Sequence, residues 1–266
     1  MTTSVALTIA GSDSSGGAGI QADLKTFAAL GVYGASAITA LTAQNTRGVT
    51  GIHPVPHQFV VEQIDAVFGD LTVGAVKIGM VAQLAVIEAV ADALKRWSPD
   101  HIVLDPVMVA TSGDRLLNAG AVNALREQLI PIASLVTPNL PEAAALLDEA
   151  VATDEAAIES QGRKLLALGC PAVLIKGGHG EGRESVDYLV RAEGVIVLSS
   201  PRIKTGNPHG TGCSLSSAIA AGLAKGEPME TAVRNAKAFV SAAIAEADRF
   251  AVGHGHGPVH HFHRFY

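Results

Sequence analysis

The segment 206–222, GNPHGTGCSLSSAIAAG, places two glycines and a cysteine directly before a run of small residues that is typical of a helix. Gly210 and Gly212 carry no Cβ, so the backbone can turn sharply and bring its N–H groups close to a ligand. The N-terminus of the helix that follows favours negative charge. We therefore expect an anion hole to which Gly210, Gly212 and Cys213 contribute backbone amides. The alternative is that residues 209–211 only cap the helix.

Cys213 is one of two cysteines, and its place in this turn allows more than one kind of chemistry. A helix N-terminus lowers the pKa of a thiol, so we expect a thiolate to be accessible near neutral pH. A covalent mechanism needs a paired base, and the nearest histidine, His209, lies only four residues upstream on the same loop. Cys170 forms no C-x-x-C motif with Cys213, which indicates a core residue and neither a disulfide framework nor a zinc site. Cys213 is expected to accept a proton or to shape the anion hole.

Other polar residues stand where predicted strands end. Short β-branched runs alternate with segments of helical periodicity, which predicts a mostly parallel sheet. Polar side chains lie at or just after these runs, namely Gln44, Asp105, Asn139 with Glu142, and Lys176. Because the carboxyl ends of parallel strands meet at one edge of a sheet, ligands bind there. We expect these side chains to converge on one site.

The elements that must position these residues follow from the same alternation. Strands are expected over residues 5–11, 34–44, 74–80, 101–107, 134–139 and 172–178, followed by a hairpin over 185–191 and 194–200. Helices are expected over residues 19–31, 57–70, 83–97, 155–169, 211–225 and 229–247. No linker or repeat interrupts the pattern, so we expect one domain over residues 1–266.

Composition excludes several classes of function. The chain is 48% hydrophobic and 17% charged with a net charge of −6, and it has no basic run. These values indicate a globular protein with a small-molecule ligand and argue against nucleic-acid and anionic-membrane surfaces. The first residues lack a basic n-region, and no segment reaches about 18 consecutive apolar residues. We expect a cytoplasmic protein.

Two nucleotide-binding motifs are not indicated. Residues 17–22, GAGIQA, match G-x-G-x-x-G/A, but they begin several residues after the predicted strand, which is wrong for the tight turn. The acidic residue expected about 20 residues later is missing, since residues 37–43 contain no carboxylate. No G-x-x-x-x-G-K-[ST] motif occurs. A phosphate must therefore be bound elsewhere, and the turn before residue 214 is the better candidate.

Several longer stretches occur in the order of a known family. They are IAGSDSSGGAGIQADLKTFAALGVYGASAITALTAQNT, VKIGM, LDPVM, TPNLPEA, LIKGGH and HGTGCSLSSAIAAGLAKG, together with the tail VGHGHGPVHHFH. Across almost the whole chain, the sequence resembles the hydroxymethylpyrimidine kinase / phosphomethylpyrimidine kinase family of thiamine biosynthesis, within the ribokinase-like superfamily. The resemblance implies a three-layer α/β/α fold with a mostly parallel central sheet and a homodimer. It also implies an enzyme that uses MgATP to phosphorylate 4-amino-5-hydroxymethyl-2-methylpyrimidine and then its monophosphate.

The resemblance assigns the pyrimidine site to Gly11, Asp23, Gln44, Met80 and Val107. The Gln44 amide can pair with both the exocyclic donor and the ring-nitrogen acceptor of an aminopyrimidine, with capping of the following turn as the alternative. Asp23 is expected to accept from the substrate's amine or hydroxyl, with a solvent-facing helix residue as the alternative. Gly11 is expected to let the strand pass close to the ring, and Met80 and Val107 to line an apolar pocket or belong to the core.

The resemblance assigns nucleotide and metal to the other polar residues. Asp105 and Glu142 are expected to organise Mg²⁺, through water, because magnesium keeps several waters and takes few carboxylates. Asn139 and Thr211 are expected at the nucleotide, and Lys176 at its phosphates as a compact positive charge. The alternative for Lys176 is a surface lysine whose ammonium group extends into solvent. Glu142 also stands in the first turn of a helix, where a carboxylate is stabilising without any ligand.

Cys213 stands where many ribokinase-like sugar kinases have an aspartate that takes the proton of the alcohol. A thiol that is either neutral or charged suits both an alcohol and a phosphate acceptor, and that is our hypothesis for the exchange. Pro208 and Lys204 depart from the family pattern: Pro208 stiffens the turn, and Lys204 is free to add a phosphate contact. For the C-terminal histidines, packing and metal binding are both open.

Two other functions are kept as alternatives. Relatives within the superfamily phosphorylate pyridoxal or pyridoxine, some with a similar glycine–cysteine turn. A non-catalytic protein that senses the pyrimidine is a third possibility, but such a protein is expected to lose Asp105, Glu142 or the GTGC turn, and all are present.

Overall fold

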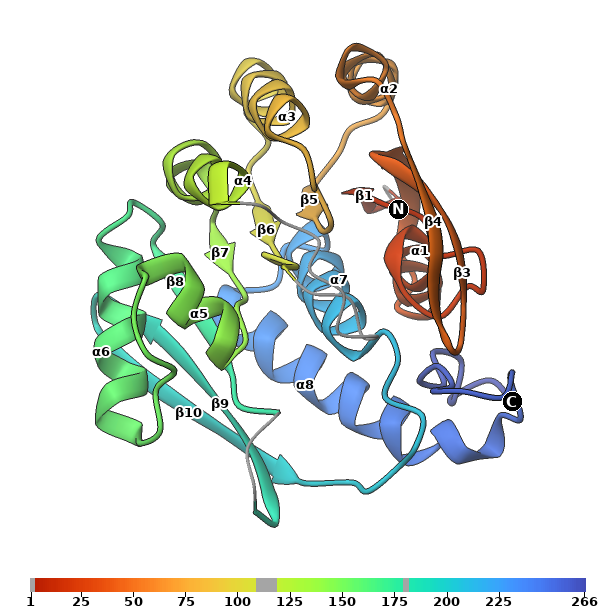
Figure 1. Ribbon diagram of the computed structural model, residues 1–266, viewed down its shortest axis with the longest axis vertical. Coiled ribbons are helices and arrows are strands. Elements are labelled where there is room, and N and C mark those ends of the chain that lie inside the picture. The colour runs from red at the N-terminus through yellow and green to blue at the C-terminus, as the bar shows by residue number, and fades with distance from the viewer. Residues whose placement is uncertain (1–2, 109–118, 179–181) are drawn as a thin grey trace.

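The structure is a computed structural model, which describes residues 3–108, 119–178 and 182–266. A mostly parallel sheet forms its centre, in the strand order β10-β9-β8-β7-β6-β5-β1-β2 (Figure 1). The strands are β1 Val5–Ala10, β2 Tyr33–Ile38, β5 Ala75–Ile78, β6 Ile102–Leu104, β7 Leu135–Val136, β8 Ala172–Lys176, β9 Glu184–Arg191 and β10 Gly194–Pro201. Strands β1, β2 and β5 to β8 run parallel, whereas the β9–β10 hairpin is antiparallel.

Helices cover both faces of the sheet. They are α1 Gly19–Ala29, α2 His57–Phe68, α3 Leu84–Trp97, α4 Ala119–Ala124, α5 Leu140–Leu147, α6 Glu155–Leu166, α7 Thr211–Ala224 and α8 Met229–Ala245. Helices α1, α7 and α8 pack in one core, and helices α2 to α6 in the other. Strand β1 contributes Leu7 and Ile9 to the second core and Ala6 to the first, because successive side chains of a strand point to opposite faces. This is the expected three-layer α/β/α fold.

The segment expected as one strand over residues 34–44 is instead two. Strand β2 ends at Ile38, and β3 Ala40–Asn45 pairs with β4 Gly48–Pro54 in a separate two-stranded sheet. The change of direction falls at Thr39, whose hydroxyl donates to the Met80 carbonyl oxygen at 2.7 Å. An apolar run does not reveal where a strand leaves its sheet. The consequence is a hairpin that carries Gln44 away from the central sheet.

The expected site residues lie at the carboxyl edge of the sheet. Strands β1, β5, β6, β7 and β8 all end there, and α7 begins beside them. The hairpin β9–β10 extends the sheet beyond β8, as the sequence predicts. Among the described helices, none has both the length and the apolar character needed to cross a membrane.

Candidate active site

One cavity of about 1190 Å³ opens along this edge of the sheet. Its volume exceeds the range typical of sites for one small molecule, about 300–1,000 Å³, which suits two co-substrates. Twelve of the thirteen predicted site residues line it: Gly11, Gln44, Met80, Val107, Asp105, Asn139, Glu142, Lys176, Gly210, Thr211, Gly212 and Cys213. Pro208 also lines the cavity, whereas Lys204 is absent from its described lining.

The glycine turn needs its two glycines for different reasons. Gly210 has φ 81° and is the N-cap of α7, and a Cβ there would overlap the carbonyl oxygen of Gly17. A Cβ at Gly212 would instead point into the site, 3.5 Å from Lys176 Nζ and 3.8 Å from Asp105 Oδ2. Gly210 therefore allows the turn to pack, whereas Gly212 keeps space open beside a cation.

Helix α7 begins without a capping side chain. The Thr211 N–H and hydroxyl both donate to the Pro208 carbonyl, at 3.2 and 2.6 Å, and the Ser214 N–H donates to the Gly210 carbonyl at 2.8 Å. Within the part of the chain that the structure describes, this leaves the N–H groups of Gly212 and Cys213 without a carbonyl acceptor. Unpaired N–H groups at a helix N-terminus favour an anion. The turn has the chemistry expected of an anion hole.

Lys176 and two carboxylates form a charged cluster beside this turn. Lys176 Nζ lies 2.8 Å from Asp105 Oδ1 and 3.8 Å from Glu142 Oε2. Burial alone would lower the pKa of Lys176, but the two carboxylates raise it above its ordinary value. Burial alone would raise the pKa of Asp105, but the charges of Lys176 and Lys77 hold it below its ordinary value. Lys176 is therefore a fixed cation and Asp105 a fixed anion.

Glu142 has a structural role that the sequence already suggested. Its carboxylate accepts from the Asn139 N–H at 2.7 Å, and the Asn139 side chain accepts from the Glu142 N–H at 2.8 Å. This reciprocal pair is a capping box at the start of α5. Burial raises the pKa of Glu142, the charge of Lys176 lowers it, and Asp105 raises it further, so the net pKa lies above its ordinary value.

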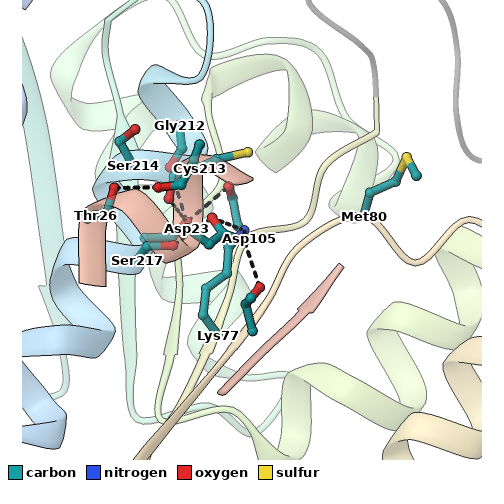
Figure 2. A network of polar contacts seen from close by, with 12 residues as sticks. Asp23, Thr26, Lys77, Met80, Asp105, Gly212, Cys213, Ser214 and Ser217 are labelled. Atoms are coloured by element: carbon teal, nitrogen blue, oxygen red, sulfur yellow. Dashed lines mark hydrogen bonds and ion pairs between the residues drawn. The ribbon is translucent and has the colours of Figure 1, made fainter. Parts of the chain in front are cut away.

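Asp23 differs from its prediction. It is fully buried, is absent from the described lining of the cavity, and accepts from Thr8 and Ser217 hydroxyls, each at 2.6 Å. Lys77 Nζ lies 2.9 and 2.8 Å from its two carboxylate oxygens. Because these three side chains already make four hydrogen bonds to the carboxylate, it is neither solvent-facing nor free to accept from a substrate. Figure 2 shows Asp23 between Ser217 on α7 and Lys77.

Lys77 is a functional candidate that sequence reasoning missed. It lies within strand β5, has no exposed surface, and nevertheless lines the floor of the cavity. Gly79 makes room for it, because a Cβ there would lie 2.6 Å from Lys77 Nζ. Burial alone would lower the pKa of Lys77, but Asp23 raises it above its ordinary value. The sequence feature that could have identified Lys77 is its charge, since a lysine inside an apolar parallel strand requires a buried partner.

Cys213 also differs from its prediction. Loss of hydration raises the pKa of its thiol to about 11, although Lys77 and an N–H from Gly19 both lower it. The Asp23 and Asp105 carboxylates add to the rise. A helix N-terminus lowers the pKa of a thiol, but at Cys213 the opposite effect of burial and of the two carboxylates is larger. The expected thiolate near neutral pH is therefore wrong for the protein by itself, where the thiol is protonated.

Gly11 and Met80 contact each other in another part of the cavity lining. A Cβ at Gly11 would overlap the Met80 methyl group, so the glycine leaves room for this flexible side chain. Gln44 lies on β3 nearby, where the Thr42 hydroxyl donates to its Oε1 at 3.2 Å. Gln44 Nε2 lies 3.5 Å from His209 Nε2. These residues combine apolar surface with one amide, which is the chemistry expected of a pyrimidine site.

Asp13 and His209 both line the cavity and contact each other, and the sequence did not single them out as partners. Asp13 Oδ2 lies 2.8 Å from His209 Nε2, and the carboxylate also accepts from the N–H groups of Ser15, Gly17 and Ala18. Burial alone would raise the pKa of Asp13, but these donors hold it well below its ordinary value. The charged Asp13 carboxylate thus holds the start of the GAGIQA segment in place. This segment is therefore a loop ordered by Asp13 and not a dinucleotide-binding motif.

The residues present have the oxygen donors that magnesium prefers. Asp105, Glu142 and Asn139 bring carboxylate and amide oxygens to one part of the cavity. Magnesium is usually bound by one or two carboxylates, several waters and substrate phosphates, so this donor set fits it. No group of three or more His, Cys, Asp or Glu side chains suited to a metal occurs among the described residues.

Comparison with known proteins identifies the family of the chain. A family model described as phosphomethylpyrimidine kinase matches residues 13–260. The chain is 58% identical over 264 residues to hydroxymethylpyrimidine/phosphomethylpyrimidine kinase of Rhizobium meliloti, with 99% of each chain covered. Its structure resembles phosphomethylpyrimidine kinase from Clostridium difficile, with a TM-score of 0.81, 44% identity and coverage of 90% and 99% of the two chains.

A second solved structure is that of a kinase for a different substrate. The ADP complex of Bacillus subtilis pyridoxal kinase matches with a TM-score of 0.92 and 38% identity over 100% of both chains. The fold and the site thus define a ribokinase-like kinase. The family match and the sequence identity place it more closely: the chain belongs to the phosphomethylpyrimidine kinase family.

Proposed function

We propose that the protein transfers the γ-phosphoryl group of ATP to 4-amino-5-hydroxymethyl-2-methylpyrimidine and then to the monophosphate formed. One observation carries the proposal. A single cavity is lined both by Gln44 and Met80 and by Lys176 with the Gly210–Cys213 turn. The Rhizobium meliloti relative is named for both activities.

The acceptor binds beside Gln44. The amide of Gln44 pairs with the ring nitrogen and the exocyclic amine of the pyrimidine, while Gly11, Met80 and Val107 contact its faces and methyl group. Support comes from their common position in the cavity lining. Asp23 acts indirectly, by holding Lys77 in the cavity floor.

The phosphoryl group is transferred beside the glycine turn. Lys176 and the amides of Gly212 and Cys213 stabilise the charge on the oxygens of the group in transfer, in a position that Gly212 leaves open. Mg²⁺, held by Asp105 and Glu142 through water, neutralises part of the phosphate charge when it is bound. Asn139 and Thr211 contact the nucleotide. Phosphoryl transfer depends mainly on such positioning and electrostatic stabilisation.

Cys213 contributes space and a weak donor to this turn. Its thiol is protonated at neutral pH, so it does not start the reaction as a base. The proton of the alcohol passes to a phosphoryl oxygen or to water as the new P–O bond forms and ADP leaves. The second acceptor is itself a phosphate, with a second pKa of about 6, and needs no base. A neutral thiol avoids the repulsion that a carboxylate would exert on that acceptor. One turn therefore serves both reactions.

The test is a direct assay of the purified protein with MgATP. Hydroxymethylpyrimidine, its monophosphate and pyridoxal are supplied separately, and products are separated by mass. We expect monophosphate and then pyrophosphate from the pyrimidine, with pyridoxal phosphorylated more slowly. Preferential phosphorylation of pyridoxal would favour the second candidate function, which the match to the Bacillus subtilis enzyme supports. Binding of the pyrimidine without turnover would instead favour a sensor.

A further inference from the structure

The C-terminal segment 253–261, GHGHGPVHH, lies between the β3–β4 hairpin and the N-terminal end of α7 (Figure 1). We call this segment the C-terminal strap. Its three glycines alternate with histidines, and Val259, His260 and His261 at its end are buried. The described residues place these histidines in no metal-binding cluster. The strap therefore needs an explanation other than a metal site.

The first half of the strap is attached to the tip of the hairpin. The N–H groups of His254 and Gly255 donate to Thr46 Oγ1 at 3.2 and 3.1 Å, and the His256 N–H donates to the Thr46 carbonyl at 2.8 Å. A Cβ at Gly253 would overlap the Thr46 side chain, and one at Gly255 would overlap its carbonyl oxygen. Thr46 lies two residues after Gln44, so this attachment holds the part of the site proposed for the acceptor.

The second half of the strap is attached to the glycine turn. The Gly257 N–H donates to Asn207 Oδ1 at 2.9 Å, and a Cβ at Gly257 would overlap that oxygen. The His209 N–H donates to the Gly257 carbonyl at 3.1 Å, and the Val259 N–H donates to the His209 carbonyl at 3.2 Å. The backbone on both sides of His209 is therefore paired with the strap.

The end of the strap reaches the first turn of α7. His261 Nε2 lies 2.9 Å from Ser214 Oγ, which itself donates to the Gly210 carbonyl at 2.8 Å. Burial lowers the pKa of His261 to about 3, and nearby Lys25, His260 and His263 lower it in the same direction. His261 is therefore neutral and forms this contact as an uncharged ring.

From these attachments we propose that the C-terminal strap is a positioning element for catalysis. It fixes the distance between the hairpin that carries Gln44 and the turn that carries Gly210, Gly212 and Cys213. The acceptor and the phosphoryl group are thereby held in reacting geometry, a role that rests on the proposed function. Neither Thr46 nor the strap glycines line the cavity, so they act through the residues they hold.

The glycines allow a matched test. Gly255→Ala disturbs the attachment to the hairpin, and Gly257→Ala disturbs the attachment to the turn. Gly206→Ala is the control, because a Cβ there meets nothing within 4 Å and its backbone is not left-handed. For each variant, KM for the pyrimidine, KM for ATP, kcat and the affinity for ADP with Mg²⁺ are measured well below the melting temperature.

The two attachments predict different kinetic changes. Gly255→Ala should raise KM for the pyrimidine about fivefold or more and leave ADP affinity unchanged, because only the hairpin moves. Gly257→Ala should lower kcat about tenfold or more and weaken ADP binding, since displacements near 1 Å cost up to about 100-fold in rate. Gly206→Ala should behave as the parent. A milder variant, Thr46→Val, removes one side-chain acceptor and should raise the pyrimidine KM by about twofold to fivefold.

Other outcomes distinguish failure of the strap proposal from failure of the proposed function. If Gly255→Ala and Gly257→Ala lower only the melting temperature and keep the kinetic constants of Gly206→Ala, the strap is merely structural and the proposal is overturned. If parent and control both fail to phosphorylate the pyrimidine, the proposed function fails instead. The strap is then still tested by ADP affinity, which Gly257→Ala must weaken and Gly255→Ala must not.

Discussion

Lys77 and Asp23 form an ion pair that is closed to solvent on both sides, with Nζ 2.8 Å from Oδ2 and no exposed surface on either side chain. The pair joins β5 to α1, and Ser217 extends it to α7 (Figure 2). Three elements that surround the floor of the cavity therefore depend on one buried pair.

Removal of one partner of this pair should strongly destabilise the protein. Asp23→Asn leaves a buried ammonium without its counter-charge, and Lys77→Met leaves a buried carboxylate, each of which costs about 3–5 kcal/mol in free energy of unfolding. Urea unfolding measures the loss. The double variant should lose much less than the sum of the two, because neither charge is then left alone. Lys95→Met, which breaks an exposed pair with Asp92, is the control and should change little. Additive losses would mean that the pair does not act as a unit.

Gln44→Ala should weaken binding of the pyrimidine far more than binding of ATP. The lost amide leaves the polar edge of the ring unpaired, at a cost of about 1–3 kcal/mol, or about fivefold to 150-fold in dissociation constant. Isothermal titration with each ligand measures the difference. Asn45→Ala is the matched control, since Asn45 is the next amide along the strand, is exposed, and lies outside the described lining. Equal losses for both ligands would reject the assignment of Gln44.

Glu142→Gln should raise the magnesium concentration needed for half-maximal activity and leave pyrimidine affinity nearly intact. The glutamine oxygen can still accept from the Asn139 N–H, so the capping box survives while the charge is lost. Initial rates over a range of magnesium concentrations measure the shift. Asp154→Asn, at the N-cap of α6, is the control for a neutralised capping carboxylate. An unchanged magnesium dependence would reduce Glu142 to its capping role.

Cys213→Ala should lower the phosphorylation of the alcohol and of the monophosphate by similar factors, less than about tenfold. A general base contributes about 10²–10⁴-fold, so a loss of that size confined to the alcohol would show that Cys213 takes its proton after all. Both rates are measured on one preparation with ATP and magnesium saturating. Cys213→Asp should depress the second step more than the first, because a fixed carboxylate meets an anionic acceptor.

The protonation state of Cys213 is checked separately by alkylation with iodoacetamide in a Cys170→Ala background. Because the raised pKa keeps the thiol protonated below about pH 11, reaction at pH 8 should be about tenfold or more slower than that of a free cysteine. The rate should increase as the pH approaches 11. A plateau reached near neutral pH would mean that the thiolate is present under assay conditions.

Hydrophobic periodicity predicted most of the fold, including α1, α3 and the β9–β10 hairpin, because long amphipathic and apolar runs have few alternative packings. It failed where the structure depends on which neighbouring strand a segment pairs with. An apolar run continues through Thr39, and only the backbone shows that β3 leaves the sheet to pair with β4.

The site could be predicted where residue type and strand end coincide, as for Asp105, Asn139 and Lys176. It could not be predicted where the partner lies far away in the sequence. Lys77 meets Asp23 across 54 positions, and His209 meets Asp13 across 196. The pKa of Cys213 was missed for a related reason, because a helix terminus is visible in the sequence but burial and two distant carboxylates are not.

The protonated thiol has a consequence for chemical durability. Peroxides oxidise the thiolate and spare the thiol, and susceptibility increases with exposure of the sulfur. Burial raises the pKa of Cys213 to about 11, and the same is true of Cys170. At neutral pH we therefore expect both thiols to form sulfenic acid slowly, and Cys170 is in addition buried, whereas Cys213 is partly exposed in the cavity. Peroxide should inactivate this enzyme more slowly than an enzyme whose active-site cysteine is ionised.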